Sequence, residues 1–212
     1  MSRTRIKICG ITNAEDALEA VRLGADAIGL VFYPPSPRFV SAEQAVAICR
    51  VLPPFVTIVG LFVDAGRDSI DQILATVPLD LLQFHGNESA ADCACYNRPY
   101  IKAVSMSPGL DVNAYMAAYT DARGFLLDTH HVSLPGGSGE TFDWGRFPQS
   151  AAQSLILAGG LDANNVGTAI TQLKPYGVDV SSGVEASKGV KDHARLAEFF
   201  QEVVNADARN IK

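Results

Sequence analysis

Short apolar runs rich in β-branched residues alternate along the whole chain with longer segments that carry apolar residues at helical spacing. The runs show little of the apolar–polar alternation typical of a sheet with one wet face, so they predict strands buried on both faces. The predicted strands are Arg5–Cys9, Asp26–Phe32, Val56–Val63, Asp80–His85, Tyr100–Ser105, Gly124–Asp128, Ser154–Ala158 and Val178–Ser181.

The segments between these strands predict amphipathic helices. The clearest are Ala14–Leu23, Ala42–Leu52, Asp68–Thr76, Val112–Tyr119, Ala163–Leu173 and Asp192–Asn205, and the weaker ones are Glu88–Cys95 and Trp144–Ser150. Thr12 with Glu15 and Ser41 with Gln44 have the spacing of capping boxes. Asp162 is a further candidate N-cap.

Eight strand–helix units in a row predict a (β/α)₈ TIM barrel, an α/β fold of parallel strands. With 212 residues the chain is near the short end for this fold, so residues 1–212 are expected to form a single domain. The alternative is a doubly wound open sheet. Its glycine-rich fingerprint is missing, because Cys9-Gly10-Ile11-Thr12 follows the first predicted strand.

Composition narrows the class of protein. The net charge is −6, and this acidic balance disfavours a nucleic-acid partner. No apolar run approaches the roughly 20 residues of a membrane helix, and no leader sequence is evident, so a cytoplasmic protein is expected. The four cysteines and four histidines form no known ligand motif, and no metal site is predicted. No apolar surface stripe stands out, which favours a monomer over a homodimer.

Polar residues interrupt several predicted strands near their carboxyl ends, which form the catalytic face of such barrels. They are Cys9, His85, Asp128 and Ser181. Cys9 is either a small buried apolar residue or a nucleophile or base at the barrel mouth. Asp128 either caps the next segment or is an acid in a partly dry site.

Strand alternation adds a packing hypothesis. If Cys9 points into the barrel, so does Lys7, and if Ser181 does, so does Asp179. The first and eighth strands are neighbours in a closed barrel, so Lys7 and Asp179 are expected to form a buried pair. In the alternative, the first strand faces the other way.

Three loops have candidate anion-binding chemistry. Gly159 and Gly160 follow the seventh strand, and Ser181-Ser182-Gly183 ends the eighth, where barrels often bind phosphate. Both could be ordinary glycine turns. Arg38 lies in a proline-rich loop suited to holding a carboxylate, unless it is a free surface arginine. The loop from His130 to Asp143 is either a mobile lid or an inert excursion.

Several segments in one order resemble the phosphoribosylanthranilate isomerases of tryptophan biosynthesis. They are Lys7-Ile8-Cys9-Gly10-Ile11-Thr12, Gly24-Ala25-Asp26-Ala27-Ile28-Gly29, Val31-Phe32-Tyr33, Ser36-Pro37-Arg38, Gln83-Phe84-His85-Gly86, Leu126-Leu127-Asp128-Thr129, Gly136-Gly137-Ser138-Gly139, Thr141-Phe142-Asp143-Trp144, Ala158-Gly159-Gly160-Leu161 and Asp179-Val180-Ser181-Ser182-Gly183-Val184-Glu185. They span residues 7–185, almost the whole chain.

The resemblance implies a barrel without cofactor or metal that performs an Amadori rearrangement. The substrate would be N-(5-phosphoribosyl)anthranilate and the product 1-(2-carboxyphenylamino)-1-deoxyribulose 5-phosphate. It implies that Asp128 is the general acid, Cys9 the general base and Arg38 the carboxylate ligand. The two glycine-bearing turns would bind phosphate, and His85 and Asp179 would lie in the pocket.

Other functions are also consistent with these residues. Another phosphate-binding barrel enzyme, such as a sugar-phosphate epimerase, would share the glycine-bearing turns but would need more metal ligands at the strand ends. A barrel that only senses a sugar phosphate would need neither Cys9 nor Asp128. The substrate range could also extend to the related aminoaldose of histidine biosynthesis.

Overall fold

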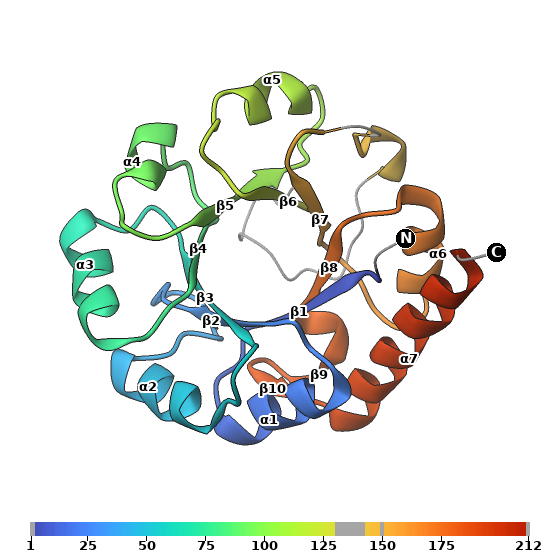
Figure 1. Cartoon of the computed structure of the whole chain (residues 1–212), viewed down its shortest axis with the longest axis horizontal. Helices are drawn as coiled ribbons and strands as arrows, with labels where there is room; N and C mark the ends of the chain where they lie inside the picture. The colour runs from blue at the N-terminus through green and yellow to red at the C-terminus, as the bar shows by residue number, and fades with distance from the viewer. Residues whose placement is uncertain (1–2, 130–142, 149–150, 211–212) are drawn as a thin grey trace.

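Eight parallel strands close into a barrel in the computed structural model, which describes residues 3–129, 143–148 and 151–210 (Figure 1). The first strand pairs with both the second and the eighth, so the predicted (β/α)₈ barrel is confirmed and the open sheet is excluded. The strands are β1 (Arg5–Cys9), β2 (Ala27–Val31), β3 (Thr57–Phe62), β4 (Leu81–Phe84), β5 (Tyr100–Ser105), β6 (Gly124–Asp128), β7 (Ser154–Leu157) and β8 (Gly177–Val180).

Helices surround the barrel on its outer side (Figure 1). They are α1 (Ala14–Leu23), α2 (Ala42–Val51), α3 (Arg67–Thr76), α4 (Ala90–Ala94), α5 (Val112–Ala117), α6 (Val166–Leu173) and α7 (His193–Asn210), with 3₁₀ turns η1 (Trp144–Arg146) and η2 (Ser182–Val184). Of the weak helix expected at Trp144–Ser150, only the η1 turn is present, and its last two residues lie outside the described ranges. A two-stranded hairpin of β9 (Glu185–Ser187) and β10 (Val190–Lys191) was not predicted.

Capping explains where the helices begin. Ser41 and Gln44 form the predicted capping box at α2. The box predicted at Thr12 is wrong, because Asn13 caps α1 and its side chain accepts a hydrogen bond from the Asp16 N–H at 2.8 Å. The hydroxyl of Thr12 instead donates to the carbonyl of Gly189. A polar residue one position nearer the helix therefore takes the cap.

Two apolar layers hold the barrel together. The main core lies between the strands and the helices and contains large, fully buried residues such as Phe62, Phe84 and Phe199. A smaller cluster that includes Ile101 and Leu126 packs separately from this layer, as expected for side chains inside the barrel. None of the described helices is both long and apolar enough to cross a membrane.

Candidate active site

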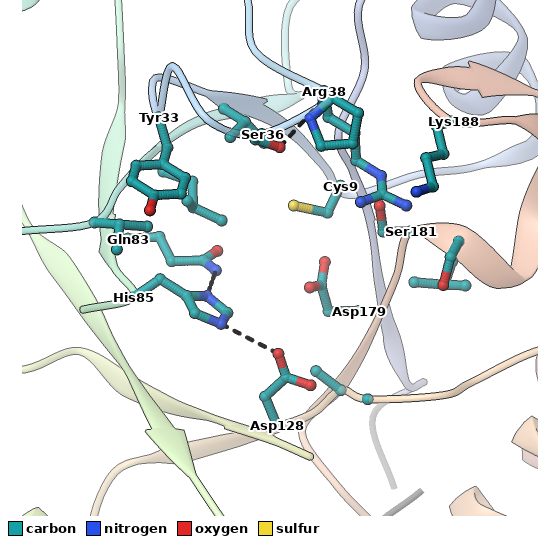
Figure 2. A pocket seen from close by; sticks show the side chains of 18 of the residues that line it. Cys9, Tyr33, Ser36, Arg38, Gln83, His85, Asp128, Asp179, Ser181 and Lys188 are labelled. Atoms are coloured by element: carbon teal, nitrogen blue, oxygen red, sulfur yellow. Dashed lines mark hydrogen bonds and ion pairs between the residues drawn. The ribbon is translucent and has the colours of Figure 1, made fainter. Parts of the chain in front are cut away.

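One pocket lies at the carboxyl ends of the barrel strands, the end at which catalytic residues of this fold gather (Figure 2). Of the predicted site residues, the pocket is lined by Cys9, Arg38, His85, Asp128, Gly159, Gly160, Asp179, Ser181 and Ser182. Side chains from strands far apart in sequence thus meet in one place, as polar strand ends predict.

The expected pair of Lys7 and Asp179 is present, and Asp179 itself lines the pocket. The Lys7 ammonium is 2.8 Å from the Asp179 carboxylate, and the two residues are 6% and 8% exposed. A β-carbon at Gly29 on the next strand would lie 2.9 Å from the Cys9 Sγ and 3.0 Å from the Lys7 Nζ, so only glycine leaves room for both groups. Lys7 and Cys9 therefore point into the barrel, and the opposite orientation of β1 is excluded.

Cys9 is only 6% exposed, yet it lines the pocket. Burial raises the pKa of its thiol, and the nearby Lys7 ammonium opposes that rise. Burial would lower the pKa of Lys7, but Asp179 and Cys9 outweigh it and raise that pKa above its ordinary value. A charged lysine beside the sulfur is the local feature that favours a thiolate.

The buried pair gives a stability prediction. Lys7→Met should lower the free energy of unfolding by about 3–5 kcal/mol, because it leaves the buried Asp179 carboxylate without its partner. The measurement is urea unfolding followed by circular dichroism. The double variant Lys7→Met/Asp179→Leu is the matched control and should recover part of the loss. A single variant as stable as the wild type would contradict a buried ion pair.

Asp128 is held at the end of β6 by two hydrogen bonds. Its Oδ1 accepts from the Thr129 N–H at 2.8 Å, and its Oδ2 lies 3.1 Å from the His85 Nε2. On the far side of the imidazole, the His85 Nδ1 lies 3.0 Å from the Gln83 side-chain nitrogen. Asp128 is thus part of a three-residue hydrogen-bonded chain, and this role goes beyond capping a loop.

Arg38 is not a free surface residue. Its Nε and Nη2 donate to the two carboxylate oxygens of Glu185 at 2.7 and 2.8 Å. Lys191 also contacts Glu185, at 3.1 Å. Burial would raise the pKa of Glu185, but Arg38 and Lys191 hold it below its usual value. The ion pair orients the guanidinium, and its Nη1 has no partner among the described residues.

The two glycine-bearing turns meet at the other rim. Gly159 has a φ of 82°, and a side chain there would come within 2.7 Å of Asp128 Oδ1. The N–H groups of Gly159 and Gly160 donate to no described acceptor, and the buried Ser181 hydroxyl has no described partner. Gly183 does not line the pocket, because it packs against the Leu161 carbonyl, where a β-carbon would collide. It joins the two turns, while the neighbouring residues face the cavity.

Sequence reasoning missed several pocket residues. Gln83, Tyr33 and Lys188 line the cavity, and Glu185 orients Arg38. Gln83 could have been found, because it lies two positions before His85 and shares its face of the strand. The candidate lid at 130–143 lies almost wholly outside the described residues. Within the described ranges, no three His, Cys, Asp or Glu side chains are grouped to hold a metal ion.

Comparison with known proteins places this chain in a family. The family profile described as N-(5'-phosphoribosyl)anthranilate (PRA) isomerase matches residues 6–202. The chain is 57% identical over 206 residues to the isomerase of Pseudomonas fluorescens strain SBW25, covering 97% of this chain and 98% of that protein.

Two crystal structures of isomerases of this family are similar to the chain. That of the Thermotoga maritima isomerase superposes with a TM-score of 0.84 at 41% identity, over 95% of this chain and 99% of that one. An isomerase in complex with reduced 1-(o-carboxyphenylamino)-1-deoxyribulose 5-phosphate gives 0.81 at 40% identity, with the same coverage. The chain therefore belongs to the N-(5'-phosphoribosyl)anthranilate isomerase family and is an isomerase of tryptophan biosynthesis.

Proposed function

We propose that this isomerase converts N-(5'-phosphoribosyl)anthranilate to its aminoketose with Asp128 as general acid and Cys9 as general base. The observation that carries the proposal is the arrangement of the pocket: a hydrogen-bonded carboxyl and a lysine-flanked thiol face the same cavity from opposite sides (Figure 2). General acid–base catalysis needs such groups within reach of one substrate.

The first step opens the furanose ring. Acting as the acid, Asp128 gives a proton to the ring oxygen while the C1–O bond breaks. The nitrogen lone pair forms a C=N bond to C1, which yields an open-chain protonated Schiff base. The bonds from Thr129 and His85 fix the direction of the Asp128 carboxyl, and such positioning is a large part of catalytic effect.

The second step moves the double bond. The Cys9 thiolate removes the proton from C2, and the C2–H electron pair forms C1=C2 while the C=N electrons return to nitrogen. The resulting enolamine becomes the aminoketose when C1 gains a proton and the C2 hydroxyl loses one. Over the whole sequence two protons enter, at the ring oxygen and at C1, and two leave, from C2 and from its hydroxyl, so the net change is an isomerisation without redox chemistry.

The two anionic ends of this substrate have matching partners. The N–H groups of Gly159 and Gly160 and the hydroxyl of Ser181 have no partner among the described residues and suit a phosphate, with Ser182 beside them and Gly183 joining the turns. Arg38 suits the anthranilate carboxylate, because Glu185 takes only its Nε and Nη2 and no described residue contacts its Nη1. Asp179 keeps Lys7 charged next to the thiol.

Arg38 gives a binding prediction. Arg38→Met should raise KM by about 10- to 100-fold and change kcat much less, since a hydrogen bond to a charged group is worth about 1.5–3 kcal/mol. Steady-state kinetics on the fluorescent substrate measure both constants. Arg38→Lys keeps the charge but loses the planar fork, and an intermediate KM is expected. An unchanged KM in the folded Met variant would remove Arg38 from the binding site.

The test of the proposed reaction is turnover. Phosphoribosylanthranilate is generated in place, and the decay of its fluorescence is followed with the wild-type protein. Rapid decay is expected. A barrel that only senses a sugar phosphate would bind a reduced product analogue without turnover, and an epimerase would act on a ketose phosphate instead.

A further inference from the structure

Gln83 occupies an unusual position at the inner end of the pocket. It is 1% exposed and lies on β4, two residues before His85 and on the same face of the strand (Figure 2). Its side-chain nitrogen lies 3.0 Å from the His85 Nδ1. Its Oε1 is buried without a partner among the described residues.

The contact with Gln83 determines which imidazole nitrogen carries the proton. An amide NH₂ only donates, so the His85 Nδ1 must accept and is unprotonated. The proton of the neutral ring is then on Nε2, which lies 3.1 Å from the Asp128 carboxylate oxygen. An Nε2–H donates to that oxygen. The other tautomer would present a nitrogen lone pair there, which could only accept the proton that the acid has to give.

The Oε1 of Gln83, which has no partner among the described residues, indicates that this glutamine has a functional role. Buried amides in a protein core normally satisfy both ends. Here the described structure leaves Oε1 without a partner and directs the nitrogen at His85. The arrangement favours one histidine tautomer at the expense of a hydrogen bond elsewhere.

We propose that Gln83 is a positioning residue for the isomerisation: its amide holds His85 as the Nε2–H tautomer, and His85 in turn orients the Asp128 carboxyl. This inference rests on the proposed role of Asp128 as the acid. Gln83 acts only through His85, so its loss should affect the chemical step more than substrate binding.

The test reads the tautomer directly. Protein labelled with ¹⁵N at histidine is examined by NMR without substrate at about pH 8, where an ordinary histidine is neutral. The His85 signals are assigned with His85→Gln. The expected wild-type spectrum has a protonated Nε2 and an unprotonated Nδ1. In Gln83→Glu the carboxylate can only accept, so Nδ1 should become protonated.

Kinetics supply the second readout. Gln83→Met keeps the length of the side chain but has no N–H to donate to the His85 Nδ1. The value of kcat should fall about 10- to 100-fold, with KM little changed. Gln72→Met, on the exposed face of α3, is the matched control and should retain full kcat.

Two results would overturn the proposal. One is a wild-type His85 with its proton on Nδ1, which needs no variant to fold. The other is a folded Gln83→Met protein with wild-type kcat. If Asp128→Asn retained full turnover while the NMR result held, the assignment of the acid would fail and the tautomer assignment would survive.

Discussion

Replacing Asp128 by asparagine is expected to lower kcat by about 10²–10⁴-fold, the usual contribution of a positioned general acid. The amide is close in size to the carboxyl and can still accept from the Thr129 N–H. It has no acidic proton to give to the ring oxygen. The furanose ring then opens only as fast as water or the unaided substrate allows. The fluorescence decay assay measures the loss.

A matched control separates this chemical effect from damage to the fold. Asp121 is an exposed aspartate in the loop before β6, and Asp121→Asn should leave kcat unchanged. Both variants should give the wild-type circular dichroism spectrum. A folded Asp128→Asn protein with a kcat within a few-fold of the wild type would exclude Asp128 as the acid.

Replacing Cys9 by serine should also cost about 10²–10⁴-fold in kcat. A serine hydroxyl is far less acidic than a thiol, so it supplies almost no anionic base near neutral pH. The residue is small and lines the pocket beside Lys7 and Gly29, so the exchange of sulfur for oxygen leaves no large cavity. The substrate should still bind, and KM should change much less than kcat.

The chain contains its own control for thiol chemistry. Cys95 is exposed, and Cys95→Ser should keep full activity. Cys49 and Cys93 do not line the pocket, and burial raises their pKa to about 11 and about 12, so neither thiol is placed to act as the base. If Cys9→Ser turned over at the wild-type rate, the reaction would need another base.

The sequence was sufficient to predict the barrel, because the order of its strands and helices follows from local residue patterns. Apolar runs and helix caps such as Ser41 are recognisable within a few residues of sequence. The predicted strands accordingly differ from the observed ones by at most one residue at each end. The weak segment after the sixth strand was harder to predict. Trp144–Arg146 forms only a 3₁₀ turn. The β9–β10 hairpin depends on pairing between two very short strands, which leave no apolar periodicity in the sequence.

The candidate site likewise contains residues that local patterns predict and residues that only the fold brings together. Polar residues at strand ends identified Cys9, His85 and Asp128, and strand alternation identified the Lys7–Asp179 pair. The partner of Arg38 could not be predicted from spacing, because Glu185 is 147 residues away and reaches it only through the fold. Spacing can place Gln83 on the same face of the strand as His85, but its contact with the His85 Nδ1 depends on the folded side chains.

The most direct test of the acid–base assignment is the kinetic isotope effect of deuterium at C2 of the substrate, measured in Cys9→Ser and Asp128→Asn. Removal of the C2 proton should limit the Cys9 variant, which then shows a large primary effect on kcat. Ring opening should limit the Asp128 variant, where the effect should vanish. The reverse pattern, or equal effects in both variants, would contradict the assignment of Cys9 to C2 and Asp128 to the ring oxygen.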